Sequence, residues 1–276
     1  SLISLLPPSL PPLFSRPTPV RSALHSFKDL YLSPERLTLP TVCCRFANFA
    51  PPLAQICWTK FAVSLWKRYT TKRRILEKGI AHEEKLSIIN PGADVEENQE
   101  GEFEKYFLYP SRFRRYKRQD LAIKAFREAE LDEFELVLAG SNQEPEFVEE
   151  LREMIDEEDN VEIKTDLPGE EWKELYRNCY SVIFLAEKED WGIIPIEAAS
   201  HGKPTIAVNE GGPKESVLHD QTGFLTDPEP EDIAKYMEEL AESREKVEQM
   251  GKRGREEAEK YSWNKFVNRL DDKVEE

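Results

Sequence analysis

The chain has 276 residues, 39% of them hydrophobic, so it can bury the core of one large or two ordinary domains. Its net charge of −16 argues against nucleic acid as a partner, because binding phosphates needs a basic face. It has no run of about 18 apolar residues, so we expect no membrane span. The four cysteines lack metal-ligand spacing and favour buried free thiols in a cytoplasmic protein.

The charge is unevenly distributed along the chain. Residues 1–80 contain 12 basic and 3 acidic residues, whereas the other 196 residues contain 51 acidic ones. Residues 1–55 hold 10 of the 19 prolines and show no helical or alternating period, so they do not indicate an independent domain. A basic helix is predicted from about 58 to 78. Residues 85–97 then predict a short strand, a Pro-Gly turn and an acidic linker.

From residue 106 onward the sequence becomes regular. Short apolar runs rich in aromatic or β-branched residues predict buried strands, and the amphipathic segments between them predict helices. Strict alternation of the two predicts right-handed βαβ units and a doubly wound parallel sheet, which is an α/β, Rossmann-like fold. The predicted strands are 106–111, 134–140, 161–165, 180–186, 204–208 and 222–226.

Three more helices are expected after the last strand. The final one begins after Ser262, which suits an N-cap, so we separate a C-terminal helix at 263–276 from a domain at 103–262. The expected helices are 230–242, 244–260 and 263–275.

Two carboxylates stand where such a sheet binds its ligands, in the loops at the carboxyl ends of the strands. Glu189 ends the loop after the fourth predicted strand, Gly192 removes side-chain bulk, and Glu197 enters the next helix. An ionised carboxylate can accept two hydroxyl hydrogens at once, which suits the vicinal diols of ribose and hexose. The pair therefore predicts a site that grips two sugars.

A basic segment, SRFRRYKRQD, directly follows the first predicted strand. Arg112 can fork onto phosphate oxygens and Lys117 can act as a mobile point charge, so the segment suits a phosphate group between two sugars. The other three arginines, Arg114, Arg115 and Arg118, are expected to form a solvated face.

Two other interpretations of Glu189 and Glu197 are open. They could be the acid and base of a glycosidase, although nothing else in the sequence indicates attack by water. They could also bind a metal ion, but no histidine or aspartate cluster accompanies them, so we predict no metal site.

Three segments carry a resemblance to a known family: SRFRRYKRQDLAIKAF, EDWGIIPIEAASHGKPTIAV and EGGPKESVLHDQTGFL. In this order and spacing they resemble the C-terminal, donor-binding domain of family 4 (group 1) glycosyltransferases, which have the GT-B fold, and they are most similar to mannosyltransferase-like members. The resemblance covers about 85–276 and implies a nucleotide-sugar-binding domain at 103–262 after a linker at 85–102. Residues 1–84 then correspond to a truncated or aberrant remnant of the N-terminal acceptor domain.

The resemblance also implies roles for single residues. Arg112 and Lys117 match the residues that hold the donor diphosphate and stabilise the departing nucleotide. Glu189 matches the first glutamate of the E-x7-E motif, which contacts the transferred sugar and completes the catalytic set. Glu197 matches the second glutamate, which binds the nucleotide ribose. Further donor contacts are implied for the backbone amides of Gly192, Ile193 and Ile194.

The implied activity is a retaining transfer of a hexose, mannose by analogy, from a nucleotide diphosphate sugar to a saccharide or lipid-linked acceptor. The resemblance implies no cofactor and no metal, because positive side chains and helix dipoles neutralise the leaving diphosphate. The donor is a substrate, with GDP-mannose preferred by analogy. The expected partners are this donor and a glycan or lipid-linked acceptor, and peripheral association at the inner face of the membrane is a further expectation.

The incomplete first domain leaves two alternatives to a transferase. One is a noncatalytic nucleotide-sugar-binding module, and a weaker one is a nucleotide-sugar epimerase, against which the E-x7-E context argues. In the family the last helix crosses back to the first domain, so we expect an exposed apolar face at Trp263, Phe266 and Leu270. His201 is expected to be a capping or surface residue.

Overall fold

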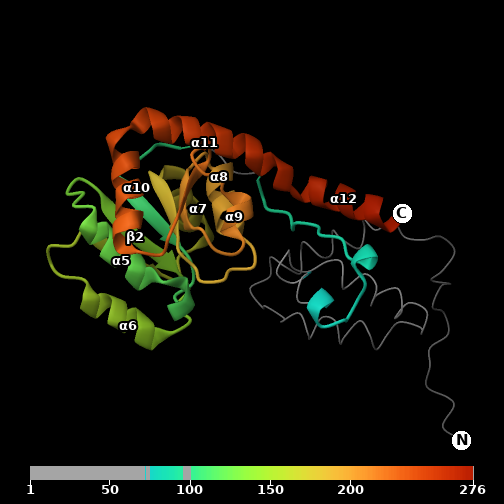
Figure 1. Cartoon of the computed structure of the whole chain (residues 1–276). Coiled ribbons are helices and arrows are strands. Elements are labelled where there is room, and N and C mark those ends of the chain that lie inside the picture. Colours follow the sequence, from blue (N-terminus) through green and yellow to red (C-terminus); the bar gives the residue numbers. More distant parts are fainter. Residues whose placement is uncertain (1–71, 73–74, 96–100, 276) are drawn as a thin grey trace, which may run out of the picture. The chain divides into compact units, whose positions relative to one another are not determined.

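The computed structural model describes residue 72, residues 75–95 and residues 101–275 (Figure 1). Contacts divide the chain into two units, and the unit Thr59–Phe266 contains the sheet. Of the other unit the structure describes only 267–275. Most of the expected acceptor-domain remnant, 1–84, and most of the basic helix lie outside the described residues, and the proposed domain boundaries stay predictions.

Six parallel strands form the sheet in the order β3-β2-β1-β4-β5-β6. The strands are β1 (Tyr106–Pro110), β2 (Glu135–Gly140), β3 (Val161–Thr165), β4 (Ser181–Phe184), β5 (Thr205–Val208) and β6 (Gly223–Thr226). Each begins within one residue of its predicted start, and the doubly wound α/β fold is confirmed. The order reverses between β1 and β4, which makes their carboxyl ends the topological switch point where such folds bind ligands.

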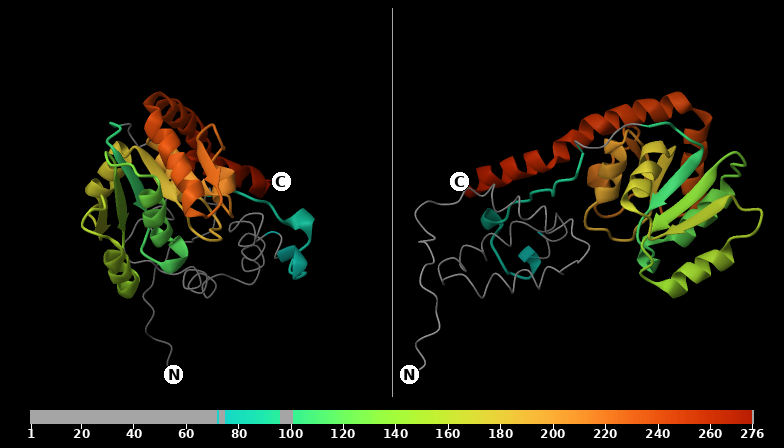
Figure 2. Two further views of the ribbon diagram at one scale, coloured as in Figure 1. Left: turned by 60° about the vertical axis from the view of Figure 1, so that its left-hand side comes forward. Right: turned by 180° about the vertical axis from the view of Figure 1, so that it is seen from behind.

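Helices cover both faces of the sheet (Figures 1 and 2). The helices with described bounds are α5 (Gln119–Glu128), α6 (Pro145–Met154), α7 (Gly169–Asn178), α8 (Ile193–Ser200), α9 (Pro213–Ser216), α10 (Pro230–Glu242), α11 (Arg244–Ala258) and α12 (Trp263–Glu275), with 3-10 turns η1 (Glu83–Lys85), η2 (Arg115–Lys117) and η3 (Glu259–Tyr261). Because side chains alternate along a strand, Phe107 and Tyr109 of β1 face a core shared with α5, α6 and α10. Tyr106 and Leu108 face the opposite core, with α7 and α8.

The strand predicted within residues 85–97 is wrong for the described part of that segment. Residues 86–92 form no regular element, and Ala93 makes one isolated bridge with Ser262. The Ala93 amide donates to the carbonyl oxygen of Tyr261 at 2.8 Å, and a Cβ on Gly92 would lie 2.7 Å from the Trp263 ring. The segment is therefore held by η3 and the start of α12 instead of by a sheet.

The exposed apolar face expected on the last helix is also wrong. Phe266 is 7% exposed and Leu270 1% exposed. Trp263, which packs edge-on against Phe266 with ring centroids 5.7 Å apart, is half-buried. The predicted cap is confirmed, because Oγ of Ser262 accepts a hydrogen bond from the amide of Lys265 at 3.3 Å.

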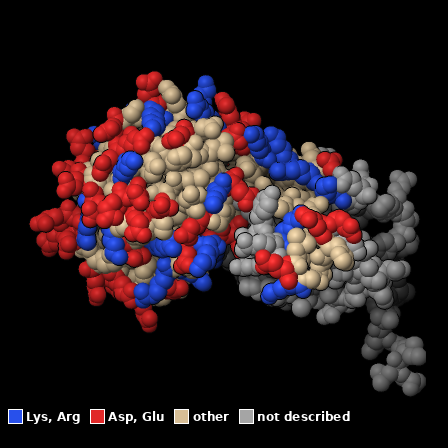
Figure 3. All heavy atoms as spheres, in the orientation of Figure 1, with Lys and Arg blue, Asp and Glu red and all other residues tan. Residues whose placement is uncertain are grey.

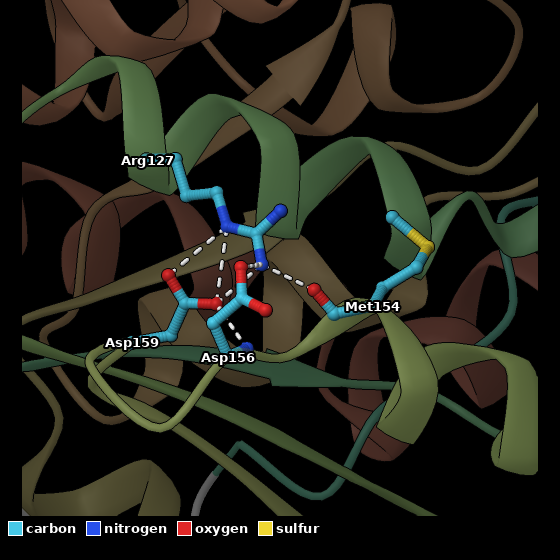
Figure 4. A network of polar contacts seen from close by, with 4 residues as sticks. All are labelled: Arg127, Met154, Asp156 and Asp159. Atoms are coloured by element: carbon cyan, nitrogen blue, oxygen red, sulfur yellow. Dashed lines mark hydrogen bonds and ion pairs between the residues drawn. The ribbon is translucent and has the colours of Figure 1, made fainter.

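Arg127, at the end of α5, fixes the turn between α6 and β3 (Figure 4). Its Nε donates to both carboxylate oxygens of Asp159, at 3.0 and 3.1 Å, and its Nη2 donates to Asp156 at 3.3 Å. The carbonyl oxygen of Met154 accepts from the same guanidinium. Asp159 in turn accepts from the amide of Asp156 at 2.8 Å. One side chain thus ties a turn of acidic residues to the helix beside it.

Lys203, just before β5, is buried although it carries a charge. It is 1% exposed, and its Nζ donates to the carbonyl oxygen of Glu102 at 2.6 Å. The same Nζ lies 3.6 Å from the centroid of the Phe103 ring, a cation–π contact. Lys203 therefore fixes the point at which the chain enters the sheet.

The surface of the sheet-bearing unit is rich in acidic side chains, which crowd its left edge in Figure 3, as expected for an acid-rich segment.

Candidate functional site

The site predicted from the sequence lies at the switch point. The loop after β1 ends in η2 and carries Lys117, the loop after β4 carries Glu189, and α8 begins directly after that loop. The loop after β5 leads into α9 at Pro213. Since the strands are parallel, their carboxyl ends bring these three loops to one edge of the sheet.

Lys117 and Glu189 form an ion pair, with Nζ 2.5 Å from Oε2. The Lys117 side chain is 5% exposed and that of Glu189 24% exposed. The Nζ lies 5.1 Å from the ring centroids of both Tyr116 and Phe184. Burial lowers the pKa of Lys117, while the charge of Glu189 and their hydrogen bond oppose that shift. The pair is thus a charged contact in a largely dry, aromatic setting.

Tyr109 fixes the backbone that carries Lys117. Its ring is fully buried in β1, and its hydroxyl donates to the carbonyl oxygen of Lys117. The same hydroxyl accepts from the amide of Leu185 at 3.2 Å, at the start of the loop that carries Glu189. One side chain therefore ties both loops to the sheet. The sequence does not reveal this role, because a tyrosine in an apolar run indicates only burial.

The loop after β5 packs against the loop that carries Glu189. The amide of Gly212 donates to the carbonyl oxygen of Glu189 at 2.6 Å. Gly211 has φ of 57°, and a Cβ there would lie 2.3 Å from the same oxygen, so only glycine fits. A Cβ on Gly192 would lie 2.2 Å from Oγ of Ser216, which can rotate away, and 3.1 Å from Cα of Pro213. Close packing of the protein on itself therefore favours a glycine at this position of the predicted motif.

Glu197 lies one helix turn into α8 and makes a different contact. Its Oε2 accepts a hydrogen bond from the hydroxyl of Tyr176, on α7, at 2.9 Å. Burial raises the pKa of Glu197 to about 7; the Tyr176 hydrogen bond opposes this shift and the charge of Asp94 adds to it. The Tyr176 ring stacks on His201 with centroids 5.6 Å apart. His201 is the C-cap residue of α8, which confirms the expected capping position, but it is 4% exposed and so is not a surface residue.

The remaining predicted contacts surround the start of α8. Gly192 is its N-cap, Ile193 is 36% exposed and Ile194 is half-buried. The first amides of a helix lack partners within it and attract anions. Arg112, in the loop after β1, is exposed, and its guanidinium makes no hydrogen bond or ion pair within the part of the chain that the structure describes.

The three arginines expected to be solvated differ from one another. Arg115 forms an exposed pair with Glu150 at 2.5 Å, and Arg114 donates to Gln143 at 3.0 Å. Arg118 departs from the expectation, because its side chain is 24% exposed and lies between two acidic loops.

Within the described ranges, no group of three or more His, Cys, Asp or Glu side chains is placed to hold a metal ion. No helix among these residues is long and apolar enough to cross a membrane.

Comparison with known families identifies the family of the chain. Residues 93–257 match the family of glycosyl transferases, group 1. The chain belongs to that family. The resemblance found in the three sequence segments is therefore confirmed for this group 1 glycosyltransferase.

Curated relatives are similar to the same part of the chain. An alpha-1,3/1,6-mannosyltransferase ALG2 from Mus musculus is 33% identical over 180 residues, which are 59% of this chain and 43% of that protein. The ALG2 of Dictyostelium discoideum is 32% identical over 186 residues, 60% of this chain and 44% of that protein. The chain thus spans less than half the length of these relatives.

Solved structures share the fold. The Anabaena protein Alr3699/HepE, crystallised with UDP and glucose, superposes with a TM-score of 0.68 at 19% identity, over 76% of this chain and 62% of that one. Sucrose-phosphate synthase from Thermosynechococcus elongatus gives a TM-score of 0.66 at 20% identity, over 77% and 57% of the two chains. The Rossmann-like, GT-B type of architecture is therefore established for the sheet-bearing unit.

Proposed function

We propose that this group 1 glycosyltransferase transfers a hexose, with retention of anomeric configuration, from a nucleotide diphosphate sugar to a glycan or lipid-linked acceptor. The observation that carries the proposal is the buried pair of Lys117 and Glu189, which lies at the switch point directly before the helix of Glu197. The ALG2 relatives are named mannosyltransferases, which supports mannose as the sugar and GDP-mannose as the donor.

Lys117 and Arg112 would stabilise the departing diphosphate. An ammonium group has three hydrogens, so Lys117 can keep its bond to Glu189 while donating to a phosphate oxygen. Burial lowers the pKa of Lys117, and an arriving anion would favour its charged form again. Arg112 is exposed and could close on the phosphates without breaking an ion pair to another described residue. Such prearranged charges act most strongly in a dry site.

Glu189 and Glu197 would each hold one sugar of the donor. Lys117 engages Oε2 of Glu189, which leaves its other oxygen to accept from hexose hydroxyls. Tyr176 engages Oε2 of Glu197, which leaves its other oxygen for the ribose. The amides of Gly192, Ile193 and Ile194, at the start of α8, would meet the phosphates and the hexose. This assignment requires neither a resident cofactor nor a metal ion.

Calorimetric titration of the 276-residue chain with GDP-mannose and with UDP-glucose tests the proposal. We expect saturable binding of GDP-mannose, which Lys117→Ala and Glu197→Ala weaken. Unaltered binding in both variants would refute the site assignment, and binding of UDP-glucose alone would refute the preferred donor. Absence of binding by either donor would contradict the proposed function itself.

A noncatalytic nucleotide-sugar-binding module is the second candidate, because all the residues proposed to hold the donor lie in the unit that contains the sheet. Turnover separates the two candidates. The transferase predicts release of nucleotide that depends on added acceptor, for which a lipid-linked saccharide is the first choice. Binding without any such release would favour the module.

A lipid-linked acceptor would bring the protein to the cytoplasmic surface of a membrane. Residues 1–80 hold 12 basic and 3 acidic residues, and such a segment is attracted to anionic lipids. We expect the chain to sediment with vesicles that contain phosphatidylserine and to remain in solution with neutral vesicles. Equal behaviour with both would contradict peripheral binding through these charges.

A further inference from the structure

Arg118 adopts a backbone conformation that favours glycine. It directly follows Lys117 and precedes α5, with φ of 56° and ψ of 44°, which is the left-handed region. This region is unfavourable for a residue with a Cβ, because the Cβ approaches the following carbonyl oxygen. Glycine would fit there at lower cost and is tolerated as an N-cap. The presence of an arginine at this position must therefore be explained by what its side chain contacts.

The guanidinium of Arg118 lies between two acidic loops. Its Nη2 is 4.0 Å from Oε2 of Glu187, in the loop after β4, and its Nη1 is 3.7 Å from Oε2 of Glu210, in the loop after β5. The Arg118 side chain is 24% exposed, against 38% for Glu187 and 34% for Glu210. Nη1 is buried and has no hydrogen-bond partner, so its attraction to Glu210 acts through charge. Lys188 also pairs with Glu187, but it is 82% exposed.

Backbone hydrogen bonds tie the loop that carries Glu187 and Glu189 to its two neighbouring loops. The amide of Glu187 donates to the carbonyl oxygen of Tyr116 at 2.8 Å, and the amide of Gly212 donates to that of Glu189 at 2.6 Å. Without Arg118, Glu187 would keep only Lys188, and Glu210 would lose the cation that links it to the loop of Glu187. Loss of this shared attraction would then favour separation of the two loops.

We propose that Arg118 is a positioning residue, which clamps the loops of Glu187 and Glu210 together and thereby fixes Glu189 beside Lys117. The inference rests on the proposed function only where donor binding is concerned, since Glu189 is there assigned to the transferred sugar. The clamp itself concerns two loops of the unliganded protein.

Amide hydrogen exchange tests the clamp without any donor. Arg118→Gly removes both the guanidinium and the backbone strain, so it should leave the thermal midpoint unchanged or higher. The amides of Glu187 and Gly212 should nevertheless exchange about threefold to tenfold faster, which is the scale of coupling between neighbouring side chains. The matched control is Glu130→Gly, because Glu130 also has a left-handed φ of 46° but lies exposed beyond the end of α5. Equal exchange at these amides in both variants would overturn the proposal.

Donor binding gives the second readout. In Arg118→Gly the Kd for GDP-mannose should rise about threefold to tenfold, and Arg118→Lys should recover part of this loss. The double variant Glu210→Gln/Arg118→Gly should bind GDP-mannose no more weakly than the weaker-binding of the two single variants, because both changes break the same contact. Effects that multiply instead would mean independent roles and would contradict the clamp. A wild-type chain that binds no donor would sink the proposed function, while hydrogen exchange would still decide on Arg118.

Discussion

The hydroxyl of Tyr176 donates to Oε2 of Glu197 at 2.9 Å, while the ring of the same tyrosine stacks on buried His201. Helix α7 thereby holds a carboxylate of α8 whose pKa burial has raised to about 7. The group proposed to grip the ribose is therefore only partly ionised at neutral pH, and Tyr176 favours its charged form.

Donor affinity should depend on pH through Glu197. A carboxylate accepts from ribose hydroxyls better than a carboxylic acid does, so GDP-mannose should bind more tightly as pH rises through about 7. We expect the Kd to fall by up to about tenfold between pH 6 and pH 8, as for one proton released. Calorimetry across this pH range measures the Kd. The diphosphate of a nucleotide sugar does not titrate in this range, so the ligand itself should not contribute to the pH dependence. A pH dependence that survives in Glu197→Gln would assign it to another group.

Removal of the Tyr176 hydroxyl should move this pH dependence upward. Tyr176→Phe deletes a hydrogen bond that lowers the pKa of Glu197, so the midpoint should rise and binding at pH 7 should weaken about threefold to tenfold. The matched control is Tyr106→Phe, which deletes a hydroxyl that donates to the backbone carbonyl of Leu175 at 2.8 Å. The control should leave the midpoint in place. A midpoint that falls or stays in Tyr176→Phe would contradict the predicted coupling.

The ionised form of Glu197 should also lower the free energy of unfolding. Its pKa is raised on folding, so the folded state favours the proton, and stability falls as pH rises from about 4.5 to about 7. Glu197→Gln keeps an oxygen for Tyr176 but removes the charge, and it should raise the free energy of unfolding by about 2 kcal/mol at pH 8. At pH 4 the two proteins should be nearly equal. Chemical denaturation at both pH values measures the difference, and a gain confined to low pH would reverse the sign argued here.

Replacement of Lys117 should weaken donor binding and should also cost some stability. Lys117→Met exchanges a buried ammonium for an apolar chain of similar length but leaves the carboxylate of Glu189 without its cation. Because the Glu189 side chain is 24% exposed and can reach water, the free energy of unfolding should fall by about 1 to 2 kcal/mol, less than for a fully buried charge. The affinity for GDP-mannose should fall about thirtyfold or more, since a charge-assisted phosphate contact is lost. Arg115→Ala, on the exposed pair with Glu150, is the control and should bind normally. Normal binding by Lys117→Met would remove Lys117 from the site.

Arg127 offers the opposite case, a network far from the proposed chemistry. Arg127→Ala should lower the free energy of unfolding by about 1 kcal/mol, a small value because the arginine is partly solvated. The bonds to Arg127 hold the pKa of Asp159 below its usual value. This contribution is therefore present above the usual aspartate pKa and disappears as pH falls through the lowered one. Denaturation at pH 7 and pH 3 measures the loss; a larger loss at pH 3, or weaker donor binding at pH 7, would contradict this reasoning.

The sequence was sufficient for the sheet and for the placement of the proposed site residues at one edge of it, because both follow from local patterns. Apolar runs located the strands, and the placement of Lys117, Glu189 and Glu197 after them predicted one shared edge. The contact of Lys117 with Glu189 was not foreseen, since it joins residues 72 positions apart.

The errors in the sequence-based predictions share a physical cause. The periodicity of apolar residues indicates which side chains are buried, but not which residues they contact. It could not show that Tyr176 reaches Glu197, or that Gly92 packs on Trp263 instead of joining a sheet. Arg118 was assigned to solvent because arginine clusters usually are solvated, although its side chain turns between two acidic loops. Long-range side-chain contacts of this kind leave no local signature.

The buried Lys203 bears on how the domain can be isolated. Its ammonium rests on the carbonyl oxygen of Glu102 and the ring of Phe103, both of which come before the first strand. A recombinant fragment that began at Lys105 would keep every strand and helix of the sheet but would deprive a 1% exposed lysine of both contacts. A fragment for crystallisation or ligand screening should therefore begin upstream of Glu102, even though no strand or helix is lost by cutting later.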